Sequence, residues 1–83
     1  MTTVKVKFTS LNYVSNFVNR VSKFDTDIDI KRGHAVLDGK SLEGLFALEM
    51  NRELDCIIHD DMCNIPELME AIKEFTISDF SKI

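Results

Sequence analysis

Two serines stand directly before amphipathic stretches, where phosphoryl chemistry is possible. Ser10 precedes an apolar pattern that begins at Leu11, and Ser41 precedes one that begins at Leu42. Free backbone N–H groups at the start of a helix favour a phosphate on such a hydroxyl. An ordinary N-cap, in which the hydroxyl accepts a hydrogen bond from the first turn, uses the same position. The sequence around Ser10 shows no activating base, so we expect a link or a helix cap there.

The other reactive side chains are scattered along the chain. We expect His34 in a turn and His59 near the end of a strand, and an isolated exposed histidine requires no function. Asp25, Asp27 and Asp29 alternate along a strand edge without the central glycine of a calcium loop, which indicates a solvated surface. The sequence also lacks a glycine-rich phosphate loop. It therefore predicts no enzyme, no catalytic residue, no metal site and no cofactor.

The length and the cysteine content limit the class of protein. A chain of 83 residues allows one domain, residues 1–83, with one modest core. Cys56 and Cys63 are too few for a disulfide scaffold and do not have the spacing of a zinc knuckle, so we expect free thiols. No apolar run approaches the roughly 20 residues that cross a bilayer, and the N-terminus lacks the apolar block of a secretory signal. We expect a cytoplasmic protein without a membrane partner.

The charge balance bears on nucleic-acid binding. The formal net charge is −4 at pH 7. Because phosphate neutralisation needs clustered Lys and Arg, this charge argues against nucleic acid as a partner. One local basic patch remains possible, made of Lys5, Lys7, Arg20 and Lys23.

Residue spacing predicts a strand and a helix at the N-terminus. Residues 4–8 alternate between apolar and polar side chains, as one strand does when one of its faces is buried. Residues 11–23 carry apolar side chains at steps of three and four, which predicts an amphipathic helix. Ser10 and Asn12 both offer an oxygen that can cap it.

A hairpin and a short helix follow. Residues 27–31 and 35–37 predict two strands, with Gly33-His34 as the tight turn between them. Asp38-Gly39 then makes a further turn, and a short helix begins near Ser41.

The last third of the chain predicts one more strand and one more helix. Residues 50–53 form a polar loop, residues 54–59 alternate as a strand, and Asp60-Asp61 turns the chain. Asn64 with Pro66 marks the start of a helix. The inner stripe of this helix is Ile65, Leu68, Met69, Ile72 and Phe75. The tail that packs at the edge carries Ile77, Phe80 and Ile83.

The order of these elements is β-α-β-β-α-β-α. Every helix has to bury an apolar stripe, and one antiparallel sheet that is covered on one face meets that demand. We therefore expect an α+β fold, an open-faced β-sandwich with a four-stranded antiparallel sheet covered on one face by three helices. Ile57 and His59 would lie on the face that is open to water.

Two segments carry a family resemblance. Residues 40–46 read Lys-Ser-Leu-Glu-Gly-Leu-Phe, and residues 21–28 read Val-Ser-Lys-Phe-Asp-Thr-Asp-Ile. They resemble the regulatory-serine segment and the helix-to-strand segment of HPr, the small phosphocarrier of the bacterial phosphotransferase sugar-uptake system. The resemblance covers most of the chain and implies the same open-faced fold.

The resemblance fails at the phosphoacceptor. In HPr proteins the first helix opens with His-Ala-Arg-Pro, and its histidine carries the phosphoryl group. The corresponding residues here are Ser10, Leu11, Asn12 and Tyr13, so histidine, arginine and proline are absent. Ser10 thus takes the position that corresponds to the family phosphoacceptor.

The resemblance also implies a regulatory site. Ser41 matches the serine that a dedicated kinase modifies in some bacteria. Glu43 departs from the apolar or basic residues often found there, and its carboxylate would repel a phosphate. N-capping by Ser41 alone stays open as the alternative.

HPr proteins dock onto the transferase enzymes through an apolar patch of their first two helices. The resemblance therefore implies protein partners, either phosphotransferase-system enzymes or a regulator. The residues that correspond to such a patch are Leu11, Tyr13, Leu42 and Phe46. A short helix usually buries two of three apolar side chains, so we expect two of Leu42, Leu45 and Phe46 to be buried.

Three functions stay open. The favoured one is a non-phosphotransferring regulatory or protein-binding module, monomeric or weakly dimeric, because the histidine is missing. The second is an active phosphocarrier that uses Ser10 or Ser41 as its acceptor. The third is a small structural protein that self-associates through the sheet face around Ile57.

Overall fold

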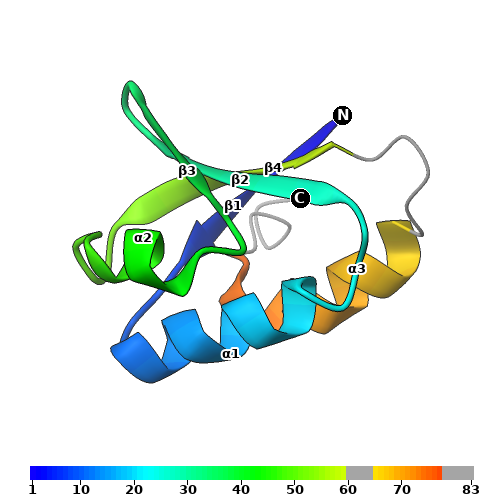
Figure 1. Ribbon diagram of the computed structural model, residues 1–83, viewed down its shortest axis with the longest axis horizontal. Coiled ribbons are helices and arrows are strands. Elements are labelled where there is room, and N and C mark those ends of the chain that lie inside the picture. Colours follow the sequence, from blue (N-terminus) through cyan, green and yellow to red (C-terminus); the bar gives the residue numbers. More distant parts are fainter. Residues whose placement is uncertain (60–64, 78–83) are drawn as a thin grey trace.

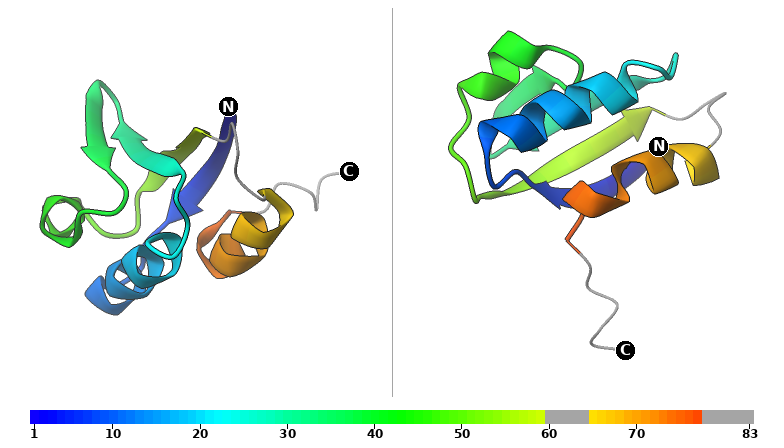
Figure 2. Two further views of the ribbon diagram at one scale, coloured as in Figure 1. Left: turned by 45° about the vertical axis from the view of Figure 1, so that its right-hand side comes forward. Right: turned by 90° about the horizontal axis from the view of Figure 1, so that it is seen from below.

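The fold is a single antiparallel sheet with helices on one face (Figures 1 and 2). A computed structural model describes residues 1–59 and 65–77. The strands, in the sheet order β1-β4-β2-β3, are β1 (Thr2–Lys7), β4 (Glu53–His59), β2 (Asp27–Arg32) and β3 (Ala35–Asp38). The helices are α1 (Leu11–Val21), α2 (Leu42–Phe46), α3 (Ile65–Ile72) and a 3₁₀ turn, η1 (Lys73–Phe75). The predicted α+β architecture is confirmed.

Alternation along the strands separates a buried face from an open face. In the β2–β4 register, Ile28 lies opposite Ile58, and both side chains are buried under the helices. Their neighbours Asp27 and His59 also lie opposite each other, on the face that no described helix covers. Ile57 is half-buried on that open face, as the alternation predicts.

Helix α1 begins and ends through local hydrogen bonds. The hydroxyl of Ser10 accepts a hydrogen bond from the backbone N–H of Tyr13 at 3.3 Å, so Ser10 is the cap and Asn12 is not. The helix ends at Val21, two residues earlier than predicted. The N–H of Phe24 donates to the carbonyl of Val21 at 3.1 Å, so the chain leaves the helix through a tighter 3₁₀-type turn.

The turn into α2 requires a glycine. The N–H of Gly39 donates to the carbonyl of Ile28 at 2.6 Å. A Cβ at this position would lie 2.7 Å from the same carbonyl oxygen, so any side chain would push the two backbones apart. One residue later, the Asp38 carboxylate accepts the N–H of Lys40 at 2.9 Å. The predicted Asp38-Gly39 turn is confirmed.

An aromatic cluster centred on Phe75 joins the C-terminal helix to α1 and to the end of β1. The Phe75 ring centroid lies 5.5 Å from those of Phe17 and Tyr13 and 6.2 Å from that of Phe8, all in edge-to-face geometry. The Arg20 guanidinium lies 5.2 Å from the same centroid. The predicted inner stripe of the last helix is confirmed, because Leu68, Ile72 and Phe75 are buried and Ile65 and Met69 pack against them.

The edge of β1 is partly covered by the chain after η1. Thr76 bridges to Val6, and the N–H of Ile77 donates to the carbonyl of Lys5 at 2.9 Å. This confirms that Ile77 packs at the edge. The other predictions for these regions lie outside the described residues, namely those for Asp60, Asp61, Cys63, Asn64, Phe80 and Ile83.

The four cations of the possible basic patch do not form one cluster. Lys5 lies on the open face and pairs with Asp55 at 2.7 Å. Arg20 lies on the helical side and pairs with Glu74. The sheet therefore separates Lys5 from Arg20, and a carboxylate pairs with each of them. None of the described helices has the length and apolar content that a membrane span needs.

The burial of α2 yields a stability prediction. Leu45 is fully buried, whereas Phe46 on the same helix is 42% exposed. We expect Leu45→Ala to lower the free energy of unfolding by about 2–5 kcal/mol, and Phe46→Ala to lower it by less than about 1 kcal/mol. Urea unfolding of both variants measures the difference. Equal losses, or a larger loss for Phe46→Ala, would contradict this orientation of α2.

Candidate functional site

The start of α1 is built for capping. The Ser10 hydroxyl is occupied by the N–H of Tyr13, and the first turn carries no acidic side chain. Leu11 is 52% exposed. Tyr13 is half-buried, because its ring packs edge-on against Phe75. Ser10 and Leu11 therefore lie at this end of the molecule as predicted, whereas Tyr13 is largely used by the core.

The two histidines lie elsewhere. His34 is exposed in the turn between β2 and β3, where Gly33 adopts a φ of 59°. His59 ends β4 on the open face, and its Nε2 lies 2.9 Å from the Asp29 carboxylate. Since α1 covers the opposite face of the sheet, His59 does not lie at the start of that helix.

Ser41 caps α2 in the predicted manner. Its hydroxyl accepts the N–H of Gly44 at 3.3 Å, and its own N–H donates to the Asp38 carbonyl at 3.1 Å. The Nζ of Lys40 donates to the carbonyl of Phe24, which ties this turn to the end of α1. Glu43 is exposed in the first turn of the helix.

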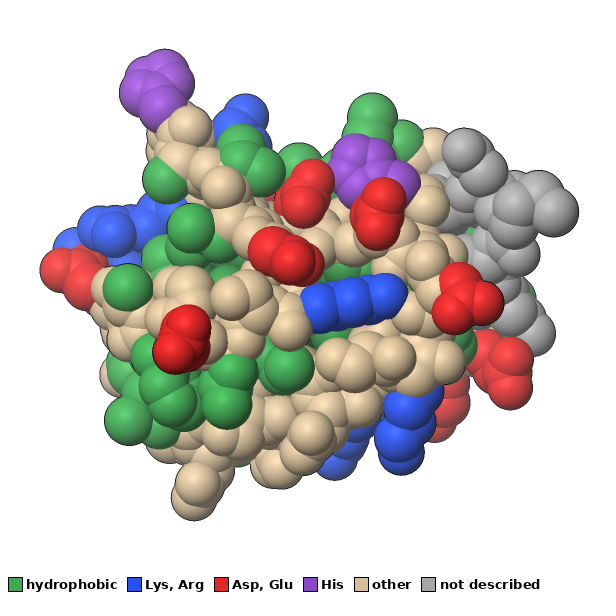
Figure 3. Space-filling model, viewed as in Figure 1, with side chains coloured by type: hydrophobic (Ala, Val, Ile, Leu, Met, Phe, Trp, Pro, Cys, Tyr) green, Lys and Arg blue, Asp and Glu red, His purple; other side chains and the backbone are tan. Residues whose placement is uncertain are grey.

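An apolar surface lies beside these caps. Leu42 is 37% exposed. Like Phe46 and Leu11, it is one of the large apolar side chains that lie at the surface. Helices α1 and α2 pack against each other. Figure 3 shows hydrophobic side chains gathered over the start of α1 and over α2. We call Leu11, Leu42 and Phe46 the helix patch.

The burial expected for α2 is wrong. Only Leu45 of the three apolar side chains is buried, not two. A helix of five residues turns little more than once, so it directs a single side chain to the core. Leu48, two residues after the helix, is buried and supplies the second contact.

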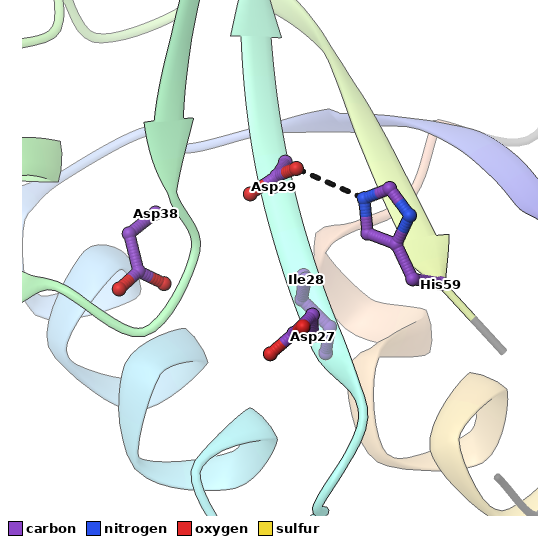
Figure 4. Close-up of a pocket in the computed structure, with 5 residues that line it drawn as sticks. All are labelled: Asp27, Ile28, Asp29, Asp38 and His59. Atoms are coloured by element: carbon purple, nitrogen blue, oxygen red, sulfur yellow. Dashed lines mark hydrogen bonds and ion pairs between the residues drawn. The ribbon is translucent and has the colours of Figure 1, made fainter. Parts of the chain in front are cut away.

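A second feature, which sequence reasoning missed, is an acidic hollow on the open face. Asp27, Asp29, Asp38 and His59, with Ile28, line a volume of about 450 Å³ (Figure 4). The side chains come from β2, from the end of β3 and from the end of β4. No local signal predicts the hollow, because His59 meets Asp27 only through the register of strands about 30 residues apart in the chain.

The chemistry of the hollow is limited. Asp29 can orient the His59 imidazole through this contact, as a carboxylate does beside a general base. The residues that line it include no hydroxyl or thiol nucleophile, and no three ligand-type side chains of the described chain are grouped to hold a metal ion. Cys56, on the buried face of β4, does not serve either, because burial, with a smaller contribution from Asp29, raises its thiol pKa to about 12.

Comparison with known proteins supports the fold. No family model and no curated protein matches the chain. Among solved structures, the crystal structure of HPr-C-His from Thermoanaerobacter tengcongensis is similar, with a TM-score of 0.71 and 21% sequence identity over 89% of each chain. This likeness confirms the predicted HPr-like fold.

The cap of α2 yields a second stability prediction. We expect Ser41→Ala to lower the free energy of unfolding by about 1 kcal/mol, because the N–H of Gly44 loses its acceptor. Ser41→Asp should stay within about 0.5 kcal/mol of wild type, since its carboxylate accepts the same hydrogen bond. Ser10→Ala is the matched comparison at α1. A Ser41→Ala protein as stable as wild type would show that this cap contributes nothing.

Proposed function

We propose that this chain is an HPr-like protein-binding or regulatory module, related to the phosphotransferase sugar-uptake system, that does not pass a phosphoryl group through histidine. The observation that supports it best is the identity of residues 10–13, Ser-Leu-Asn-Tyr, at the start of α1. They stand on a fold similar to that of an HPr structure.

The chemistry at the start of α1 supports the absence of transfer. A phosphoryl carrier needs a nucleophile with a base or a suitable pKa, and nearby groups that stabilise the phosphate. Ser10 has neither the nitrogen of an imidazole nor a neighbouring base. Arg20, the arginine of α1, lies at the other end of the helix, where it bonds to the carbonyl of Ala71 and to Glu74. The Arg20 guanidinium therefore binds groups at the C-terminal end of α3 and in η1, and does not lie beside Ser10.

The helix patch supports a binding role. Leu11, Leu42 and Phe46 keep apolar surface in water at the junction of α1 and α2. Gathered apolar side chains of this kind fit the core of a protein interface. The partner class that follows is a phosphotransferase-system enzyme or a regulator with a complementary apolar surface.

Ser41 supplies a route for regulation of that surface. Its hydroxyl stands next to Leu42 of the helix patch. A phosphate there would place about two negative charges at the rim of an apolar contact, beside the carboxylate of Glu43. Phosphorylation of Ser41 would therefore weaken docking of an apolar partner.

The phosphoryl prediction is tested with phosphoenolpyruvate and the first enzyme of the phosphotransferase system. We expect no acid-labile phosphate on this chain, while an HPr protein in the same mixture becomes labelled. Mass spectrometry of the intact chain and its peptides reads the result. Label on His34 or His59 would contradict the proposal, and label on Ser10 or Ser41 would support an active carrier with an altered acceptor.

The docking prediction is tested by titration with the same purified enzyme. We expect Leu42→Glu and Phe46→Glu each to weaken binding by about tenfold or more, because each buries a charge in the contact. Val36→Glu is the matched control, since Val36 is an exposed apolar residue of β3 outside the helix patch. Amide chemical-shift changes map the contact. No binding by wild type, or equal weakening by all three variants, would refute the helix patch as the docking surface.

A further inference from the structure

The open edge of the sheet is β3. The strand order places β1 and β3 at the two edges. Thr76 and Ile77 already bond to the edge of β1. Within residues 1–59 and 65–77, β3 pairs only with β2. The hairpin of β2 and β3 also projects beyond the rest of the sheet, so its outer side is accessible (Figure 1).

The alternation of hydrogen-bond direction along β3 identifies which backbone groups point away from β2. Gly39 donates its N–H to Ile28, toward β2. In an antiparallel ladder successive residues alternate in direction, so Leu37 also faces β2 and Val36 directs its N–H and C=O to the open edge. The Val36 side chain is 56% exposed and lies opposite Lys31. At the centre of the edge, the N–H and C=O of Val36 therefore have no strand partner within the described residues. The apolar side chain of Val36 stands beside them.

We propose that a second copy of this chain pairs with this edge, β3 to β3 and antiparallel, about a two-fold axis at Val36. In this register Val36 lies opposite Val36 of the second copy, and the two residues exchange both backbone hydrogen bonds. His34 lies opposite Asp38 of the second copy. The pairing makes one continuous eight-stranded sheet.

Charge along the hairpin favours a second copy as the occupant. The turn end of the hairpin is basic through Lys31, since Arg32 pairs with Glu49 within the same copy. The other end is acidic through Asp38, since Asp29 already bonds to His59. An antiparallel two-fold axis reverses the strand, so the basic end of each copy lies beside the acidic end of the other. The described strand also carries no Lys, Pro or bulge of the kind that protects an edge from pairing.

The interface is short, with four residues of β3 from each copy. We therefore expect a weak dimer, with a dissociation constant on the order of 0.1–1 mM. This surface differs from the helix patch, and the inference does not rest on the proposed function.

Cysteine cross-linking tests the register. In a Cys63→Ser background, Val36→Cys brings two thiols together at the axis, where the Cα atoms of a hydrogen-bonded pair lie about 5.5 Å apart, within disulfide range. Ala35→Cys is the matched control, because it is exposed, adjacent and opposite Leu37 of the second copy. Under mild oxidation we expect the Val36→Cys dimer to form about tenfold faster. Equal rates would overturn the proposal.

Sedimentation equilibrium up to about 1 mM tests the association itself. Val36→Pro removes the outward N–H without breaking a β2–β3 hydrogen bond, and should weaken the dimer at least about tenfold. Val36→Thr keeps the N–H and the branched shape and should dimerise like wild type. Circular dichroism checks that the variants fold. If Val36→Pro does not fold, the comparison of cross-linking rates between Val36→Cys and Ala35→Cys tests the proposal instead. A wild-type protein that is monomeric at every concentration, or a dimer unaffected by a folded Val36→Pro variant, would overturn the proposal.

Discussion

The aromatic contacts around Phe75 hold the helical layer in place, and they determine which side chains of α1 remain available to a partner. Phe75 brings together Phe8 from the end of β1, Phe17 and Tyr13 from α1, and the Arg20 guanidinium. Tyr13 turns inward to this cluster, whereas Leu11 in the same turn of α1 is exposed. The Arg20 guanidinium bonds to the carbonyl of Ala71 and to the carboxylate of Glu74. Its charge therefore lies near the C-terminal end of α1, away from Ser10.

Local spacing predicted most of the fold, because each element has a local cause. Ser10 and Ser41 cap helices through bonds to N–H groups three residues ahead, so the sequence alone locates them. Alternation in residues 54–59 correctly predicted a strand with Cys56 on its buried side. The predicted first helix was two residues too long, because backbone hydrogen bonds around Phe24 close the chain into a tighter turn.

The candidate site was less predictable, because it depends on contacts between distant segments. Whether Leu42 and Phe46 are exposed depends on how α2 sits on the sheet, and five residues of periodicity do not determine that angle. The hollow formed by Asp29 and His59 depends on the β2–β4 register. Tyr13 was expected in the patch for the same reason: the sequence locates it on α1 but not beside Phe75.

The open face and the open edge of the sheet differ as surfaces for self-association. Around Ile57 the open face carries the Lys5–Asp55 and His59–Asp29 pairs. Burying that face would remove water from polar and charged groups that are already paired within one copy, at a desolvation cost that the half-buried Ile57 offsets only in part. The edge of β3 offers unpaired backbone groups at Val36, which gain hydrogen bonds when a strand joins them.

The start of α1 is stabilised by its cap. The first backbone N–H groups of a helix have no partner within the helix, and a bound anion is one acceptor that can satisfy them. Ser10 instead bonds to the N–H of Tyr13, and serine is among the best N-cap residues. Serine at this position therefore stabilises the start of α1. The core around Phe75 and the helix patch do not use the Ser10 side chain. Because separate contacts support the cap, the core and the helix patch, a change of residue 10 alters the helix start without altering the other two.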